Sequence, residues 1–251
     1  MRRQWLNRVP PAEGSPRGRV APCDGAMPLR TQLAVLAWFL SIPILAAEPE
    51  APKPTEGAKP PQGAIILFDG KDASKWDKAK VTPEGHLEVG AITKEKYGDA
   101  LIHVEFSIQP DPTGKKTAGN SGVYIQQRYE IQILNTAGAK PDKGGCGAIY
   151  KLKAPDVNAA KAPGEWQTYD ITFRAPRWDG QKKIANARIS VVHNGVKIHD
   201  NVEVPAKTGS GKAEGPDPGP LYLQSHGNKV YFRNLWLLPL KPEEPPKPAA
   251  P

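Results

Sequence analysis

Cysteine is almost absent from this sequence of 251 residues, which contains only Cys23 and Cys146. Because Cys23 lies in a segment that we expect to be removed, Cys146 is left alone and no intrachain disulfide can form. The run Gly-Gly-Cys146-Gly is more typical of a tight loop than of a nucleophile. The five histidines lack the spacing of zinc-finger ligands. A disulfide scaffold and a zinc finger are therefore excluded.

Long apolar runs and repeats are also missing. The longest apolar run, from Leu33 to Leu45, falls short of the roughly 20 residues that span a bilayer. Glycine has no three-residue period, no heptads run through the chain, and no amphipathic helix of three turns is visible. These absences exclude a multispan membrane protein, a collagen and a coiled coil.

The one apolar run has the layout of a secretory signal. Arg30 precedes the run, and the small residues Ala46 and Ala47 follow it. We therefore expect residues 27–47 to be a cleaved signal peptide, with Met27 as the true start and 1–26 as a spurious upstream extension. The mature protein would be secreted or periplasmic and would have no stable membrane span.

Net charge gives less information than its value of +8 suggests. Six of the 34 basic residues and only two of the acidic ones precede residue 48, so the remaining chain is weakly basic with mixed charges. This distribution argues against a nucleic-acid partner.

Proline marks the domain boundaries. Residues 48–62 are Pro-rich and predict a flexible linker, and residues 241–251 predict a Pro-rich tail. Between them, residues 63–240 form one block without an internal repeat. We expect this block to be a single domain.

Short strands fill this block. The sequence Asn194-Gly195 is typical of a type I′ hairpin turn. Many short strands without helices predict an all-β antiparallel sandwich. The expected strands are 65–68, 101–108, 122–127, 129–134, 166–174, 187–193, 196–199, 221–224 and 230–237.

Two of these strands alternate polar and apolar residues. In 129–134, Ile131 and Ile133 should face the core and leave Glu130 and Gln132 on the opposite face. In 101–108, His103 and Glu105 have the same outward phase. We expect these four polar side chains to converge on one open sheet face, although a solvated face is the alternative.

Familiar catalytic motifs are not visible. Residues 114–117 (GKKT) fail as a phosphate loop, and 119–122 (GNSG) lack the spacing of a nucleophile elbow. Retaining glycosidases place two carboxyls about 5–5.5 Å apart. The strand of Glu130 carries Gln132 and then Leu134 or Asn135 where further carboxylates would stand. Ordinary retaining hydrolysis by this strand is therefore not expected.

Five motifs, in order, resemble the 3-keto-disaccharide hydrolase domain family. The resemblance covers about 65–238, nearly the whole folded block. It rests on residues 67–76 (LFDGKDASKW), 119–124 with 129–134 (GNSGVY and YEIQIL), 162–169 (APGEWQTY), 193–196 (HNGV), and 223–227 with 230–235 (LQSHG and VYFRNL).

The resemblance implies a concanavalin-like jelly roll, export, and cleavage of glycosides already oxidised at C3. A C3 ketone acidifies the C2 proton, so the C1 aglycone can leave by elimination before water adds. Glu130 and His226 are the candidate acid and base, in either order. Candidate substrate-binding residues are His103, Glu105, Asn120, Gln132, Trp166, Gln224 and Arg233. Trp166 and Arg233 have structural alternatives, as core and as an ion-pair partner.

Two features keep a second interpretation open. Ser225 stands where the family pattern has Asp, and no classical triad is present. The alternative is therefore a noncatalytic carbohydrate-binding module of the laminin-G or lectin type. The expected partner is an oligosaccharide or a 3-keto-glycoside. No organic cofactor is expected, and a divalent metal held by His and Glu is an open possibility.

Overall fold

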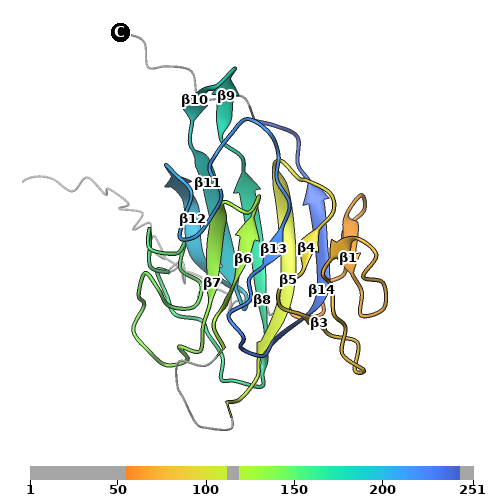
Figure 1. Cartoon of the computed structure of the whole chain (residues 1–251). Coiled ribbons are helices and arrows are strands. Elements are labelled where there is room, and N and C mark those ends of the chain that lie inside the picture. The colour runs from red at the N-terminus through yellow and green to blue at the C-terminus, as the bar shows by residue number, and fades with distance from the viewer. Residues whose placement is uncertain (1–54, 112–118, 244–251) are drawn as a thin grey trace, which may run out of the picture. The chain divides into compact units, whose positions relative to one another are not determined.

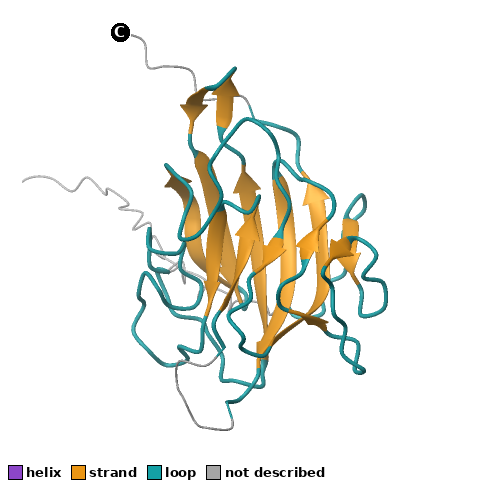
Figure 2. Cartoon of the chain, in the orientation of Figure 1, coloured by secondary structure: helices purple, strands orange, loops and turns teal. Residues whose placement is uncertain are grey.

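The computed structural model describes residues 55–111 and 119–243. These residues form fourteen strands, and none of them lies in a helix long and apolar enough to cross a membrane (Figure 2). The expected upstream extension and signal peptide, 1–26 and 27–47, lie outside the described residues. The all-β antiparallel sandwich that we expected is confirmed.

The larger sheet, here the seven-stranded sheet, has the order β1-β14-β5-β8-β11-β12, with β3 also paired to β14. In Figure 1 it lies behind the smaller sheet. Its strands are β1 (Ile65–Phe68), β3 (Leu87–Glu88), β5 (Ala100–Ile108), β8 (Trp166–Arg174), β11 (Ala187–His193), β12 (Val196–Val204) and β14 (Val230–Pro239).

The smaller sheet, here the five-stranded sheet, has the order β2-β4-β13-β6-β7. A separate hairpin of β9 and β10 projects at the top of Figure 1. The remaining strands are β2 (Trp76–Asp77), β4 (Ile92–Thr93), β6 (Ser121–Ile125), β7 (Tyr129–Ile133), β9 (Arg177–Asp179), β10 (Lys182–Ala185) and β13 (Tyr222–Leu223).

The core lies between the two sheets and follows the two-residue period of the strands. Ile131 and Ile133 of β7 are fully buried in it, as predicted. Val104 and Phe106 of β5 enter the same core from the seven-stranded sheet. Each strand therefore has an outer face whose side chains lie outside the sandwich core.

The conformation of the turns explains which predicted strand boundaries agree with the structure and which differ from it. Asn194 and Gly195 have φ of 51° and 83° and join β11 to β12, which confirms the type I′ hairpin. The strand predicted to reach residue 127 ends at Ile125, because Gln126 and Gln127 adopt φ of 55° and 56°. Gln126 holds this turn by donating a hydrogen bond to the Tyr97 carbonyl (2.9 Å).

The described part of the predicted linker, which begins at residue 55, is hydrogen-bonded to the folded domain. Residues 55–58, here the N-terminal strap, lie against the outer face of the seven-stranded sheet. The Gly57 N–H donates to Glu105 Oε1 (2.6 Å), and the Ala58 carbonyl accepts from Asn234 (3.0 Å) and Trp236 (3.3 Å). The strap stays in place because these sheet side chains are buried polar groups that need partners.

Candidate active site

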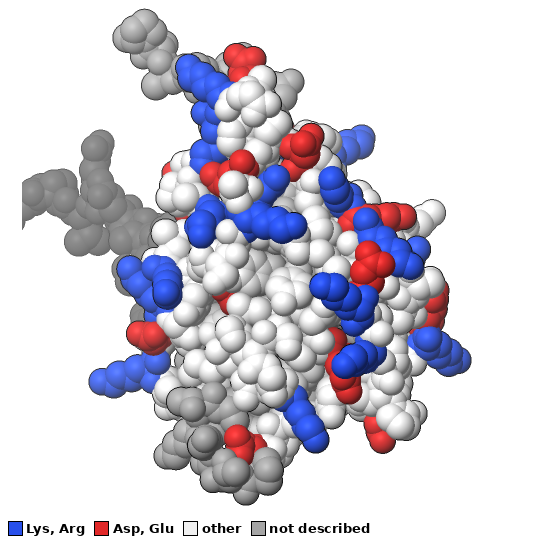
Figure 3. Space-filling view, viewed as in Figure 1, with Lys and Arg blue, Asp and Glu red and all other residues white. Residues whose placement is uncertain are grey.

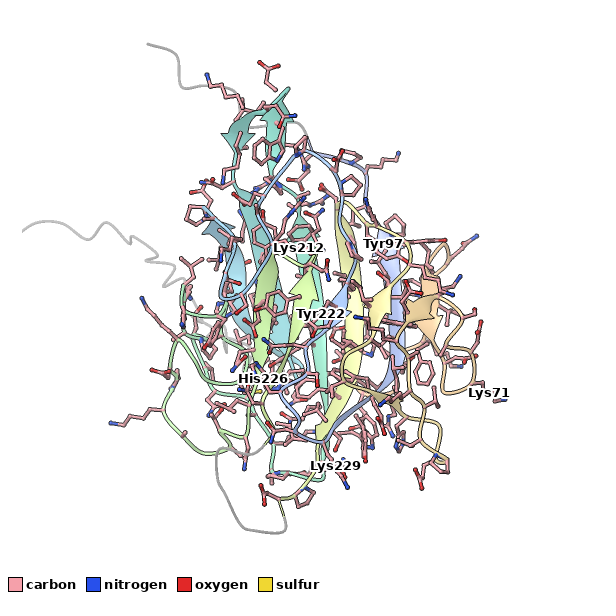
Figure 4. All side chains as sticks on the ribbon, in the orientation of Figure 1. Lys71, Tyr97, Lys212, Tyr222, His226 and Lys229 are labelled. Atoms are coloured by element: carbon pink, nitrogen blue, oxygen red, sulfur yellow. The ribbon has the colours of Figure 1, made fainter. Side chains whose placement is uncertain are left out.

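A hollow of about 270 Å³ lies on the outer face of the five-stranded sheet. Lys212, Tyr222 and His226 lie along it in Figure 4, and Figure 3 shows a central area of low charge with lysine and arginine around it. The residues that line the hollow are Tyr124, Gln127, Ser210, Lys212, Tyr222, Gln224, Ser225 and His226.

Strand register places the central side chains of this face in one row. Tyr222 of β13 pairs with Tyr124 of β6, and Tyr124 pairs with Glu130 of β7. Residues directly opposite each other on adjacent strands share a face. Gly122 is opposite Gln132, and a Cβ at Gly122 would lie 2.6 Å from Glu130 Oε1. The glycine therefore leaves the space that the Glu130 carboxylate occupies.

Glu130 is a buried carboxylate beneath the hollow, with only 1% of its surface exposed. Its Oε2 accepts a hydrogen bond of 2.6 Å from the Tyr124 hydroxyl. Burial raises the pKa of Glu130 to about 7, although the Tyr124 hydrogen bond, the Lys151 charge and Gln224 oppose the rise. A carboxyl with this pKa can both accept and release a proton near neutral pH.

Tyr124 lies between Glu130 and the hollow, because it lines the hollow and contacts the Glu130 carboxylate. The sequence analysis did not select this residue. Its hydroxyl donates to Glu130 and accepts from the Ser210 N–H (3.2 Å). Burial and the neighbouring Glu130 raise its pKa well above the usual value of 10. The sequence contained a signal for Tyr124, because this residue alternates with the core residues Val123 and Ile125 and so belongs to the outer face of its strand.

A loop over β7 closes the back of the hollow. The Thr208 hydroxyl accepts a hydrogen bond from the Glu130 N–H (2.7 Å). A Cβ on Gly209, which has a φ of 50°, would lie 2.7 Å from Glu130 Oε2 and 3.0 Å from the Tyr124 hydroxyl. The same loop brings Ser210 and Lys212 to the hollow. No strand pattern marks this loop, so no local pattern pointed to Lys212.

The predicted amides lie beside Glu130. In the orientation that satisfies its neighbours, the Gln132 amide donates to the Ser121 carbonyl (3.0 Å) and to Glu130 Oε1 (3.2 Å). Gln224 lines the hollow, and its buried Oε1 has no hydrogen-bond partner among the described residues. Because this oxygen is buried, a sugar in the hollow would meet the partly exposed remainder of the Gln224 side chain. Asn120 is held at the end of β6 by Asn228, whose Oδ1 accepts from its N–H (3.2 Å).

His226 and Ser225 form the exposed wall of the hollow. The two predicted catalytic residues therefore share one site, with His226 on its surface and Glu130 beneath Tyr124. Ser225 is also close to the Tyr222 hydroxyl, toward which its N–H points at 3.5 Å. The serine that departs from the family pattern is thus part of the hollow itself.

The prediction that His103 and Glu105 share a face with Glu130 is wrong. His103 and Glu105 lie on β5 in the seven-stranded sheet, whereas Glu130 and Gln132 lie on β7 in the other sheet. Each pair has the predicted outward phase. The two outer faces are on opposite sides of the sandwich, so the four side chains cannot converge.

The outer face of the seven-stranded sheet instead holds a closed ionic network. His103 Nδ1 lies 2.6 Å from Asp170 Oδ1, and Arg233 Nε donates to Glu105 Oε2 (2.8 Å). Burial would raise the pKa of Glu105, but hydrogen bonds from His103, Asn234, Arg233 and the strap lower it to about 2. Burial likewise opposes charge on His103, but its two carboxylate partners raise its pKa overall.

Trp166 belongs to this second face and does not reach the hollow. The guanidinium of Arg233 lies 4.0 Å from the centre of the Trp166 ring, and the His86 ring lies 5.0 Å away, edge to face. Arg233 therefore follows its structural alternative as an ion-pair partner, whereas Trp166 is partly exposed on this outer face and is not part of the core. Four of the predicted site residues, His103, Glu105, Trp166 and Arg233, are separated from Glu130 by the core.

Other features offer less chemistry. A larger hollow of about 590 Å³ between residues 134–139 and Pro163 is lined by no titratable side chain. Cys146 is buried and hydrogen-bonded to the Tyr169 hydroxyl (3.1 Å), and burial raises the pKa of its thiol. Within the described ranges, no group of three His, Cys, Asp or Glu residues is placed to hold a metal ion.

Comparison with known proteins bears on both the fold and the site. A proposed glycosyl hydrolase from Parabacteroides distasonis is 32% identical, with a TM-score of 0.65, over 72% of this chain and 85% of its own. A second from the same organism is 20% identical, with a TM-score of 0.52, over 71% and 95%, which supports the fold alone. No curated protein matches the sequence.

The sequence model for the 3-keto-alpha-glucoside-1,2-lyase-like domain matches residues 63–238. This range contains both sheets except for the last residue of β14, and it contains every residue that lines the hollow. The resemblance found in the sequence motifs is thereby confirmed. The chain belongs to the 3-keto-alpha-glucoside-1,2-lyase-like domain family and is a carbohydrate-active protein.

Proposed function

We propose that this protein is an exported enzyme that cleaves the glycosidic bond of 3-keto-glycosides by elimination, followed by hydration. Membership of the family and the likeness to a proposed glycosyl hydrolase support a carbohydrate substrate that is cleaved. The signal-like segment 27–47 supports export to the periplasm or beyond.

One observation carries the mechanism: in the described part of the chain, no carboxylate lines the hollow, and Glu130 lies buried beneath it. Glu130 lies beneath it with a pKa raised to about 7, and none of the eight residues that line it is Asp or Glu. Ordinary glycosidases use two carboxyls, about 5–5.5 Å apart for retention or 6.5–9.5 Å for inversion. One acid–base group near neutrality fits removal of an acidified C–H proton better than displacement at C1.

The proposed reaction is balanced without an oxidant or reductant. A base takes the C2 proton, and the electron pair forms an enolate on the C3 oxygen. The enolate re-forms the ketone as the C1–O bond breaks, and the leaving oxygen takes a proton from an acid. Water then adds to the C1=C2 bond, placing hydroxyl on C1 and a proton on C2.

Residues at the hollow match these requirements. Glu130 and His226 are the two acid–base groups of the site, with Glu130 acting from beneath the hollow. Lys212 lines the hollow, and its positive charge is suited to stabilise the enolate oxygen of a bound keto sugar. Gln224 in the lining of the hollow, with Asn120 and Gln132 nearby, is suited to bind sugar hydroxyls.

A noncatalytic carbohydrate-binding module remains the second candidate, because Ser225 lies in the wall of the hollow beside His226. If the family Asp at this position orients the histidine, its loss removes the acid while leaving the hydroxyl contacts. This candidate predicts sugar binding without turnover.

The test offers the purified protein 3-keto-trehalose and 3-keto-sucrose beside the unoxidised disaccharides. We expect turnover of the keto sugars only, and slower turnover when C2 carries deuterium. Glu130→Gln and His226→Ala should each lower turnover by about 100-fold or more. Equal turnover of unoxidised sugars without a C2 isotope effect would refute elimination, and tight binding without turnover would support the binding module.

A further inference from the structure

Glu130 is poorly placed to touch a substrate. It is 1% exposed and is absent from the residues that line the hollow, whereas Tyr124 is among them. The Tyr124 hydroxyl lies between the hollow and Glu130 Oε2, at 2.6 Å from the latter. A sugar in the hollow therefore meets the tyrosine oxygen first.

Hydrogen bonds fix the direction in which Tyr124 can act. Its single proton is donated to Glu130, and its oxygen accepts one hydrogen bond from the Ser210 N–H at 3.2 Å. A phenolic oxygen has a second lone pair that can accept a further proton. Tyr124 is thus arranged to take a proton from the hollow while passing its own to Glu130.

Two glycines hold the carboxylate in this arrangement. A Cβ at Gly122 would lie 2.6 Å from Oε1 of Glu130, and one at Gly209 would lie 2.7 Å from Oε2. The close approach of both backbones confines the carboxylate beneath Tyr124. Burial also makes Glu130 a stronger base than an exposed glutamate, with its pKa raised to about 7.

We propose that Tyr124 is the catalytic base that contacts C2 of the sugar, and that Glu130 is the positioning residue that receives the tyrosine proton. This inference rests on the proposed function. As the C2–H bond breaks, its proton forms a bond to the Tyr124 oxygen while the tyrosine proton moves to Glu130 Oε2. The carbon electron pair moves into the enolate. His226, on the exposed wall, then supplies the proton to the leaving oxygen.

Proton removal can be measured apart from bond cleavage with 1,5-anhydroglucitol oxidised to the ketone at C3. This compound has no aglycone at C1, so removal of its C2 proton appears in NMR as exchange with D₂O without cleavage of a glycosidic bond. We expect the protein to accelerate this exchange. Tyr124→Phe should slow it by about 100-fold or more, the usual scale for a lost acid–base group.

Three further variants test the roles of Glu130 and His226 and provide a control for loss of a tyrosine hydroxyl. Glu130→Gln should slow exchange and abolish the rise in its rate with pH through about 7, which a purely structural role would not change. His226→Ala should keep the exchange but lose cleavage of 3-keto-trehalose. Tyr97→Phe is the matched control, because Tyr97 is a buried tyrosine beside Glu95 that does not line the hollow. It should behave as the unchanged protein.

The outcomes separate this inference from the proposed function. If the protein cleaves keto sugars but Tyr124→Phe exchanges C2–H within about threefold of the unchanged protein, Tyr124 is not the base. If Glu130→Gln keeps the pH-dependent rise, Glu130 does not receive the proton. If the unchanged protein neither exchanges C2–H nor cleaves keto sugars, the proposed function fails and the inference fails with it. Circular dichroism of each variant checks that it is folded.

Discussion

Two glutamates on opposite faces of the sandwich are equally buried and chemically opposite. Glu105 and Glu130 are each 1% exposed and each follow the outward phase of a strand. The pKa of Glu105 is lowered to about 2, and that of Glu130 is raised to about 7. The difference lies in their partners, since Glu105 contacts a cation and backbone N–H whereas Glu130 relies on neutral donors.

The comparison separates a structural carboxylate from a reactive one. Arg233, Asn234 and the Gly57 N–H all donate to Glu105, so its negative charge is stabilised and its proton affinity is low. Tyr124 gives Glu130 one strong hydrogen bond, which does not offset burial. Burial alone would therefore not identify the site, and the balance of charge must be known as well.

Removing the structural carboxylate should have the largest effect on stability. Glu105→Ala leaves Arg233 and His103 without their shared partner, and it should lower the free energy of unfolding by about 3 kcal/mol. Urea unfolding at pH 7 measures this loss. Glu203→Ala, on the exposed side of β12, is the matched control and should change stability little. If the folded Glu105→Ala protein lost turnover by 100-fold, the conclusion that Glu105 has only a structural role would be wrong.

The two carboxylates should respond to pH in opposite directions. Glu130 keeps its proton in the folded state up to about pH 7, against a usual value of 4.5, so its ionisation lowers stability as pH rises from 4.5 to 7. Glu105 contributes stability that is complete above pH 4.5 and is lost as pH falls toward 2.

Substitution by glutamine should expose each trend. Glu130→Gln should stabilise the protein by about 1–3 kcal/mol at pH 8 and by little at pH 5. Glu105→Gln should cost more at pH 7 than at pH 3. Thermal unfolding midpoints at these pH values give the measurement, and parallel shifts for the two variants would contradict the comparison.

Loss of the N-terminal strap should affect Glu105 but not Glu130. A chain that begins at Lys59 lacks the Gly57 N–H and the Ala58 carbonyl, and it should be about 1–2 kcal/mol less stable than one that begins at Glu48. The pH dependence of C2–H exchange should be the same in both chains. A shifted exchange profile would show that the two faces are coupled.

The smallest effect is expected for the exposed ion pair of the strap. Glu56 binds Arg233 at 2.7 Å but is 37% exposed, so Glu56→Ala should cost no more than about 0.5 kcal/mol. Urea unfolding in low and high salt tests this, because a loss that vanishes in salt identifies a screened pair. A loss as large as that of Glu105→Ala would make Glu56 part of the buried network.

Sequence periodicity predicted the faces of the strands but not their sheets. The two-residue period placed Ile131 in the core and Glu130 outside it, because the phase of a strand is a local property. Whether β5 and β7 share a sheet depends on pairings with distant strands, which no local pattern encodes. For this reason the phase argument correctly placed Glu130 and Gln132 on one outer face, but it wrongly added His103 and Glu105, which lie on the other sheet.

The residues missed by sequence analysis were missed for different reasons. Tyr124 could have been predicted, since it alternates with the core residues Val123 and Ile125 in a strand that was expected. Ser210 and Lys212 lie in a loop whose path is set by the Thr208 hydrogen bond to Glu130 and by the close approach of Gly209. Loop contacts of this kind follow from the folded structure and not from composition.

Because the first strand pairs with the last, the seven-stranded sheet can be completed only late in synthesis of the chain. Ile65 and Ile66 of β1 pair with Leu237 and Trp236 of β14, so the seven-stranded sheet lacks its edge until nearly the whole domain has left the ribosome. Contacts between such distant segments form slowly. A growing chain would then remain without its finished fold throughout synthesis, which is the condition in which a polypeptide can be threaded through a narrow translocation pore.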